Sequence, residues 1–190
     1  MARQATTSPA IRRDRGRPHR SLRAALVAVS LGLAGCFEVD ATLDRNGSGT
    51  LQMTYVPMPH ATIDSDKAKF SSPHVTVQSI TPSEKGTVLK AAFDDVTRLS
   101  TAEGFRPVSV RRERVGNGER LRILIRNPKP VPSSETGPVS RFAITLPGRV
   151  QFANRDAEVR DNRVVWRVPL TQFVSHRFTK LSVRYAAAGA

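Results

Sequence analysis

The sequence has few of the residue types from which metal sites are built. It contains one cysteine and four histidines in 190 residues, with no His-x-x-x-His spacing and no cluster of cysteine and histidine. A zinc site needs three or four convergent ligands, so the sequence predicts no metal. We interpret His60, His74 and His176 as surface or hydrogen-bonded residues.

Motifs for covalent catalysis and phosphate binding are also missing. No Gly-x-Ser-x-Gly elbow occurs, and the glycines of residues 47–49 precede a predicted strand rather than a helix. Asp64/Asp66 and Asp94/Asp95 are carboxylate pairs, but acid–base catalysis needs a geometry that spacing alone does not provide. We interpret these four as loop residues and helix caps. The sequence predicts no enzyme activity and no cofactor.

The apolar run over residues 24–34 is short, at about a dozen residues where a spanning helix needs roughly 20. Arginine-rich residues 1–23 precede it, and Leu33-Ala34-Gly35-Cys36 closes it. A basic stretch, an apolar stretch and small residues before a cysteine are typical of a lipoprotein signal peptide. We therefore expect residues 1–35 to be removed by cleavage between Gly35 and Cys36, with lipid attached to Cys36.

A diacylglycerol on Cys36 supplies two acyl chains, which is what stable anchoring needs. We expect a lipoprotein of the bacterial cell envelope whose domain faces the periplasm or the exterior. Phe37 and Glu38 follow the cysteine without an aspartate, which in a Gram-negative host indicates the outer membrane. Two alternatives remain for Cys36, an ordinary small residue at a cleavage site or a free buried thiol. Arg12-Arg13 is only a weak twin-arginine signal, because Asp14-Arg15-Gly16 follows it.

Acidic residues are scarce beside basic ones, and the net charge is +14. The leader holds seven arginines and one aspartate, which leaves +8 on residues 36–190. Such a charge attracts anionic lipids, glycans or nucleic acid. The alternative is an arginine-rich composition that serves no anionic partner.

Part of this charge is concentrated in one predicted hairpin, at Arg111, Arg120, Arg122 and Arg126. Guanidinium groups suit the phosphates and carboxylates of lipid or glycolipid headgroups, so these four are candidates for binding an anionic ligand. The alternative is a solvated edge whose charges prevent aggregation. Nucleic acid is disfavoured because the chain is predicted to be exported and few aromatic residues stand among these arginines.

Alternation of apolar and polar residues predicts β-strands along most of the chain. We expect three hairpins over 37–55, 74–94 and 108–126, followed by strands at 142–146, 150–152, around 159, 164–168 and 178–185. Residues 44–49 also match half of a calcium loop, but Tyr55 stands where the bidentate glutamate belongs, so a hairpin turn is preferred. Trp166 alternates with valines and is expected in the core.

The remaining segments predict a short helix or loop over 60–72, a helix of at most about three turns over 95–105, and a proline-rich loop over 127–139. The predicted fold class is α+β, with a mainly antiparallel β-sheet of seven to nine short strands and one or two packed helices. Residues 36–186 are expected to form one domain, and 187–190 a frayed tail.

Two motifs carry a family resemblance: Phe142-x-Ile144-x-Leu146-Pro147-Gly148-x-Val150, and Asn162-Arg163-Val164-Val165-Trp166 before a closing strand. Together with Leu33-Ala34-Gly35-Cys36 and the glycines of 47–49, these motifs resemble the LppM-type lipoprotein domain of bacterial cell envelopes. The resemblance implies an antiparallel sheet with a packed helix, a fold likened to small lipid-binding domains, and a role in lipid or glycolipid interaction. Members often continue into a C-terminal hydrophobic anchor, and no such run follows here, so Cys36 is expected to be the tether.

Two hypotheses for function follow. In the first, an anchored lipoprotein binds an envelope lipid or glycolipid. In the second, the domain docks on another envelope protein and has no lipid ligand. An enclosed apolar cavity would favour the first hypothesis, and an exposed apolar patch without a cavity the second.

Overall fold

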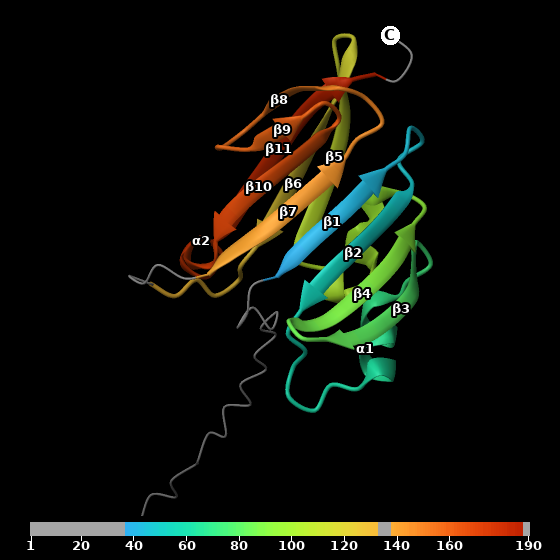
Figure 1. Ribbon diagram of the computed structural model, residues 1–190, viewed down its shortest axis with the longest axis vertical. Coiled ribbons are helices and arrows are strands. Elements are labelled where there is room, and N and C mark those ends of the chain that lie inside the picture. Colours follow the sequence, from blue (N-terminus) through green and yellow to red (C-terminus); the bar gives the residue numbers. More distant parts are fainter. Residues whose placement is uncertain (1–36, 133–137, 188–190) are drawn as a thin grey trace, which may run out of the picture.

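Two β-sheets make up most of the molecule in the computed structural model, which describes residues 37–132 and 138–187 (Figure 1). The predicted cleavage and lipidation sites, Gly35 and Cys36, lie outside these ranges, as does most of the predicted tail. Within the described ranges no helix is both long and apolar enough to cross a membrane.

The larger sheet has seven strands in the order β3-β4-β2-β1-β7-β10-β9. Their bounds are β1 (Glu38–Leu43), β2 (Gly49–Tyr55), β3 (Val75–Ser83), β4 (Gly86–Phe93), β7 (Val139–Thr145), β9 (Glu158–Arg160) and β10 (Arg163–Pro169). The smaller sheet has four strands in the order β5-β6-β11-β8. Their bounds are β5 (Val108–Val115), β6 (Gly118–Arg126), β8 (Val150–Ala153) and β11 (Phe178–Ala186).

The centre of the larger sheet joins two distant parts of the chain. β1 pairs in parallel with β7, with Val39 opposite Phe142 and Ala41 opposite Ile144. Figure 1 shows the two strands, blue and orange, side by side and pointing the same way. The other pairings between the described strands are antiparallel, and the three predicted hairpins are confirmed.

The helices are short and lie at the ends of strands. α1 (Ile63–Phe70) begins at Thr62, whose side chain forms a capping box with Ser65. α2 (Leu170–Ser175) connects β10 to β11, and the 3₁₀ helices η1 (Val96–Thr101) and η2 (Glu103–Phe105) connect β4 to β5. η2 approaches α1 so closely that a Cβ at Gly104 would lie 2.2 Å from the Phe70 ring, so only glycine fits.

One hydrophobic core lies between the two sheets and draws on both inner faces. Trp166 of β10 is almost fully buried, and its indole N–H donates to the Asn154 carbonyl at 3.0 Å. The expected core position of Trp166 is confirmed. Leu121 of β6 and Val183 of β11 face it from the smaller sheet.

Three expectations need correction. The described chain has eleven strands rather than seven to nine, because the segments expected at 150–152 and around 159 both form separate strands, β8 and β9, although these have only four and three residues. Residues 95–105 form two 3₁₀ helices rather than one α-helix, since Asp95 caps the first and Ala102 is extended between them. α2 was not predicted, because its six residues are shorter than two helical turns.

Candidate ligand-binding cavity

A cavity of about 410 Å³ lies between the inner faces of the two sheets. Its walls are mainly apolar and come from six strands and from the segments around α1, η1 and η2. The strand residues that line it are Val39, Ala41, Leu43, Leu51, Met53, Tyr55, Phe93, Val108, Val110, Leu121, Ile123, Ile125, Phe142 and Ile144. Pockets of roughly 300–1,000 Å³ with apolar walls are typical of small-molecule sites.

The cavity is closed at one end and open at the other. Leu43, Leu51 and Leu121 at the closed end are buried. Val56 and Met58, each 38 % exposed, line the opposite end. Since β1 begins opposite Thr54, two residues before Val56, and runs toward Leu43, the mouth lies at the end of the molecule where β1 begins.

The closed end is fastened by a polar cluster that joins the two sheets. The Arg112 guanidinium donates to both carboxylate oxygens of Glu119, at 2.5 and 2.8 Å, and to the backbone carbonyl of Arg45 at 2.5 Å. The Tyr185 hydroxyl donates to Glu119 at 2.6 Å. Because Arg45 lies in the turn between β1 and β2, this cluster ties that turn to β5 and β6.

These contacts change the ionisation of all three groups. The hydrogen bond with Arg112 holds the pKa of Glu119 below its usual value, and the bond with Glu119 raises the pKa of Arg112. Burial, followed by the bond to Glu119, raises the pKa of Tyr185. The cluster is therefore an ion pair with a neutral phenol as its second donor.

A buried acidic group faces the mainly apolar cavity. Asp66 of α1 is 7 % exposed, and its carboxylate accepts a 2.5 Å hydrogen bond from the Tyr55 hydroxyl. Burial, followed by that hydrogen bond, raises the pKa of Tyr55. The interpretation of Asp64 and Asp66 as loop residues or caps is wrong: Thr62 caps α1, both aspartates lie within the helix, and Asp66 is on its buried side.

Alkaline titration tests both tyrosine environments at once. Tyr55 and Tyr185 are the two tyrosines of the sequence, and the pKa of each is raised. We expect no tyrosinate absorbance between about pH 10 and 11, where free tyrosine ionises. Because the unfolded chain loses these protons and the folded chain keeps them, stability falls above about pH 10. Absorbance at alkaline pH, followed beside circular dichroism, should show tyrosinate forming together with unfolding; ionisation at pH 10 with the fold intact would contradict this.

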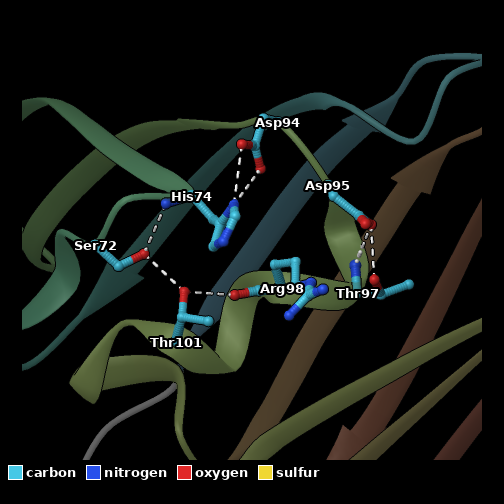
Figure 2. A network of polar contacts seen from close by, with 7 residues as sticks. All are labelled: Ser72, His74, Asp94, Asp95, Thr97, Arg98 and Thr101. Carbon is cyan, nitrogen blue, oxygen red and sulfur yellow. Dashed lines mark hydrogen bonds and ion pairs between the residues drawn. The ribbon is translucent and has the colours of Figure 1, made fainter.

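A serine, a histidine and an aspartate meet near the β3–β4 hairpin, but not as a catalytic triad (Figure 2). The His74 ring lies 3.0 Å from the Asp94 carboxylate. The Ser72 hydroxyl instead accepts from the His74 backbone N–H and lies 2.8 Å from the Thr101 hydroxyl. Figure 2 shows the histidine ring pointing toward Asp94 and away from Ser72. This network fastens η1 to the hairpin, and His74 is hydrogen-bonded as expected.

The other predicted site residues occupy ordinary positions. Asp95 caps η1 by accepting from the Thr97 backbone N–H at 2.8 Å, as expected for a cap. Ser48 and Asn46 bond to each other within the turn between β1 and β2, in keeping with a hairpin rather than a calcium loop. Among the residues that the structure describes, no group of three or more histidines, cysteines, aspartates or glutamates is placed to hold a metal ion.

The four candidate arginines lie on the outer face of the smaller sheet. Arg111 of β5 is opposite Arg122 of β6, and Arg120 is opposite Arg184 of β11. Arg126 lies further along β6, opposite Phe178. Lys180 of β11 falls on the same face by alternation.

Glu113 is the acidic residue on this face within the described strands of the smaller sheet. Its carboxylate lies 3.3 Å from Arg120 and 3.1 Å from Arg122. Arg111 and Arg126 form no ion pair with another described residue. The sequence placed these arginines together correctly, and it missed Lys180 and Arg184, which join them only through the pairing of β6 with β11.

The cavity itself was not predicted. Its walls combine the inner faces of β1 and β7 with those of β5 and β6, which meet only when the sheets pack. Met53 and Tyr55 alternate in β2 as core residues do, so no sequence signal separates a wall from a core. Asp66 offered a weak sequence signal, because it lies one helical turn before Phe70 and therefore on the same, buried side of α1.

Fold and cavity together define a β-rich α+β domain in which two sheets enclose an apolar, ligand-sized space. No known protein family matches the chain, and no curated protein is similar to it in sequence. In structure, the chain is similar to the folded domain of LppM from Mycobacterium tuberculosis, determined by NMR. The TM-score is 0.49, with 17 % sequence identity over 80 % of this chain and 90 % of that domain. LppM is also the protein type that the sequence motifs resemble, and the function of this chain rests on its own residues.

Proposed function

We propose that this protein is a non-enzymatic lipoprotein of the bacterial cell envelope that binds an envelope lipid or glycolipid, with an acyl chain in the cavity between the sheets. The cavity is the observation that carries the proposal. Its volume of about 410 Å³ and its aliphatic and aromatic walls suit a hydrocarbon chain. Burial of such a chain stabilises the complex by about 0.8 kcal/mol per methylene group.

The position of the mouth suits a ligand with a polar head. Glu103 and Arg106 are exposed and line the cavity, and Lys69 of α1 is half-buried in its wall. A headgroup there stays in water or contacts these charges while its chain is buried. Arg111, Arg120, Arg122 and Arg126 are the candidates for a second, anionic contact on the outer face of the smaller sheet.

Anchoring and location rest on residues 24–36 of the sequence. The basic leader, the short apolar run and Leu33-Ala34-Gly35-Cys36 support lipidation of Cys36 and a place on a bacterial membrane, the outer one in a Gram-negative host. Docking on another envelope protein without a lipid is the alternative. The cavity favours lipid binding, because docking onto a protein surface requires no enclosed apolar space.

The test is uptake of a fluorescent fatty-acid probe by the chain from residue 36 onward, carrying Cys36→Ser so that no acyl chain can be attached. We expect saturable binding of one probe per chain, displaced by phospholipid extracted from a bacterial envelope. Native mass spectrometry should show the same stoichiometry. Binding that never saturates, or none, would overturn the proposal. The intact mass of the full chain isolated from membranes reports separately whether Cys36 is acylated.

A further inference from the structure

Exposed large apolar side chains gather at one end of the molecule, the end at which β1 begins. We call this end the tether pole. It comprises the β2–α1 loop, the start of α1, the segment after β6 and the starts of β7 and β11, at the lower ends of the strands in Figure 1. Of the eight exposed large apolar residues in the described ranges, six lie here: Val56, Met58, Ile63, Val131, Val139 and Phe178. Scattered exposed residues are ordinary, but a cluster at one end marks an interaction surface.

Cations surround the apolar residues on the smaller-sheet side of the pole. The guanidinium groups of Arg126 and Arg177 lie 6.0 and 5.6 Å from the centre of the Phe178 ring, which is 39 % exposed. Neither arginine, nor exposed Lys129 nearby, forms an ion pair with another described residue. An aromatic ring beside two guanidinium groups suits the bilayer interface, where the ring enters the headgroup layer and the cations meet phosphates.

The chain enters the fold at this same pole. The Phe37 ring packs edge-on against Phe142 at 5.0 Å and against Phe173 of α2 at 5.4 Å. The Phe37 carbonyl accepts from the Arg141 backbone N–H at 3.1 Å. Phe37 is therefore held in place, and the predicted lipidation site, Cys36, immediately precedes it in the sequence. The apolar run of residues 24–34 precedes it directly.

The mouth of the cavity opens at the tether pole as well, because Val56 and Met58 belong both to its rim and to the exposed apolar cluster. We propose that the tether pole docks on an anionic bilayer surface, with Phe178 and the β2–α1 loop in the headgroup layer and the cavity mouth facing the lipid. The exposed apolar and basic residues of the tether pole are sufficient to support the docking contact. The passage of lipid from the bilayer into the cavity rests on the proposed function. An acyl chain then enters the cavity without crossing water.

Tryptophan fluorescence tests this orientation in the full chain. Trp166 is buried and supplies a constant background. Phe178→Trp adds a reporter at the tether pole, and Asn117→Trp adds one in the exposed β5–β6 turn at the opposite end. Each variant is reconstituted into vesicles of brominated phosphatidylcholine, with or without roughly one quarter phosphatidylglycerol. We expect bromine to quench the reporter at 178, more strongly with phosphatidylglycerol, and to leave the reporter at 117 unchanged.

Charge reversal provides the matched control. Arg126→Glu with Arg177→Glu, added to Phe178→Trp, should remove the phosphatidylglycerol-dependent part of the quenching. Arg114→Glu with Arg184→Glu makes the same change in net charge at the other end of the smaller sheet and should leave quenching at 178 intact.

Equal quenching at 178 and 117, or equal effects of the two charge reversals, would overturn the inference. A variant with a filled cavity separates this inference from the proposed function: it should lose the fatty-acid probe and keep the quenching at 178. If the filled-cavity variant lost probe binding and also the quenching at 178, docking would depend on a bound ligand rather than on the tether pole. That result would also overturn the inference.

Discussion

Ala41→Trp should abolish uptake of the fatty-acid probe, while Thr42→Trp on the same strand should leave uptake unchanged. Ala41 lies near the middle of β1, opposite Leu51 on one side and Ile144 on the other, and its side chain faces the cavity. An indole there occupies space that the acyl chain needs. We expect affinity to fall by at least about tenfold, which corresponds to ~1.4 kcal/mol.

The control isolates the cavity from the strand. Thr42 is exposed and pairs with Thr50 and Thr145 on the outer face of the larger sheet, so a tryptophan there changes the strand without entering the cavity. The indole of Ala41→Trp fills existing space. The free energy of unfolding of this variant, measured in urea, should therefore differ from that of the wild type by less than the roughly 1–3 kcal/mol typical of overpacking. Normal probe uptake by a folded Ala41→Trp protein would place the ligand elsewhere.

Glu119→Gln should lower the free energy of unfolding at pH 7 by about 2 kcal/mol, because it removes the anionic partner of a largely buried Arg112 and keeps the side-chain shape. For a domain of this size the melting temperature should fall by roughly 4–8 °C. Urea unfolding followed by circular dichroism measures the difference. The change also loosens the link to the Arg45 carbonyl at the closed end of the cavity.

The effect of Glu119 should depend on pH in one direction. The pKa of Glu119 is lowered in the folded state, so its contribution is present above the unfolded value, about 4.3, and is lost as the pH falls through the folded value. The difference between wild type and Glu119→Gln should therefore shrink below about pH 4. A constant difference down to pH 2 would show that the ion pair is not its source.

Glu113→Gln is the matched control on the neighbouring strand. Glu113 also pairs with arginines, Arg120 and Arg122, but its side chain is 41 % exposed on the outer face. Exposed pairs of this kind contribute less than about 1 kcal/mol. If Glu113→Gln destabilised the protein as much as Glu119→Gln, burial would not explain the difference between the two clusters.

The elements that local sequence describes well were predicted well. Two glycine turns fixed the predicted positions of the first and third hairpins, because glycine tolerates left-handed backbone. These glycines are Gly47, where φ is +94°, and Gly116, where φ is +62°. Alternation over 108–126 placed Arg120, Arg122 and Arg126 on one face. Such local rules act within a few residues, so no knowledge of the rest of the chain was needed.

Features that depend on distant segments were not predicted. The parallel pairing of β1 with β7 joins residues about one hundred positions apart, and neither strand carries a mark of its partner. Asp66 and Tyr55 are eleven residues apart and meet only because α1 folds back over the end of β2. Arg112 stands among other arginines in the sequence, and only tertiary contacts pair it with Glu119 and with the turn between β1 and β2.

The sequence by itself determined a β-rich fold and a basic hairpin, because residue order and periodicity encode both directly, and it predicted lipidation at Cys36. Only the tertiary structure decided that the two sheets leave an apolar cavity of about 410 Å³ between them and that its mouth opens beside Phe37. Alternation states which side chains point inward. Whether those side chains meet or leave space depends on how far apart the two sheets pack, which no single strand encodes.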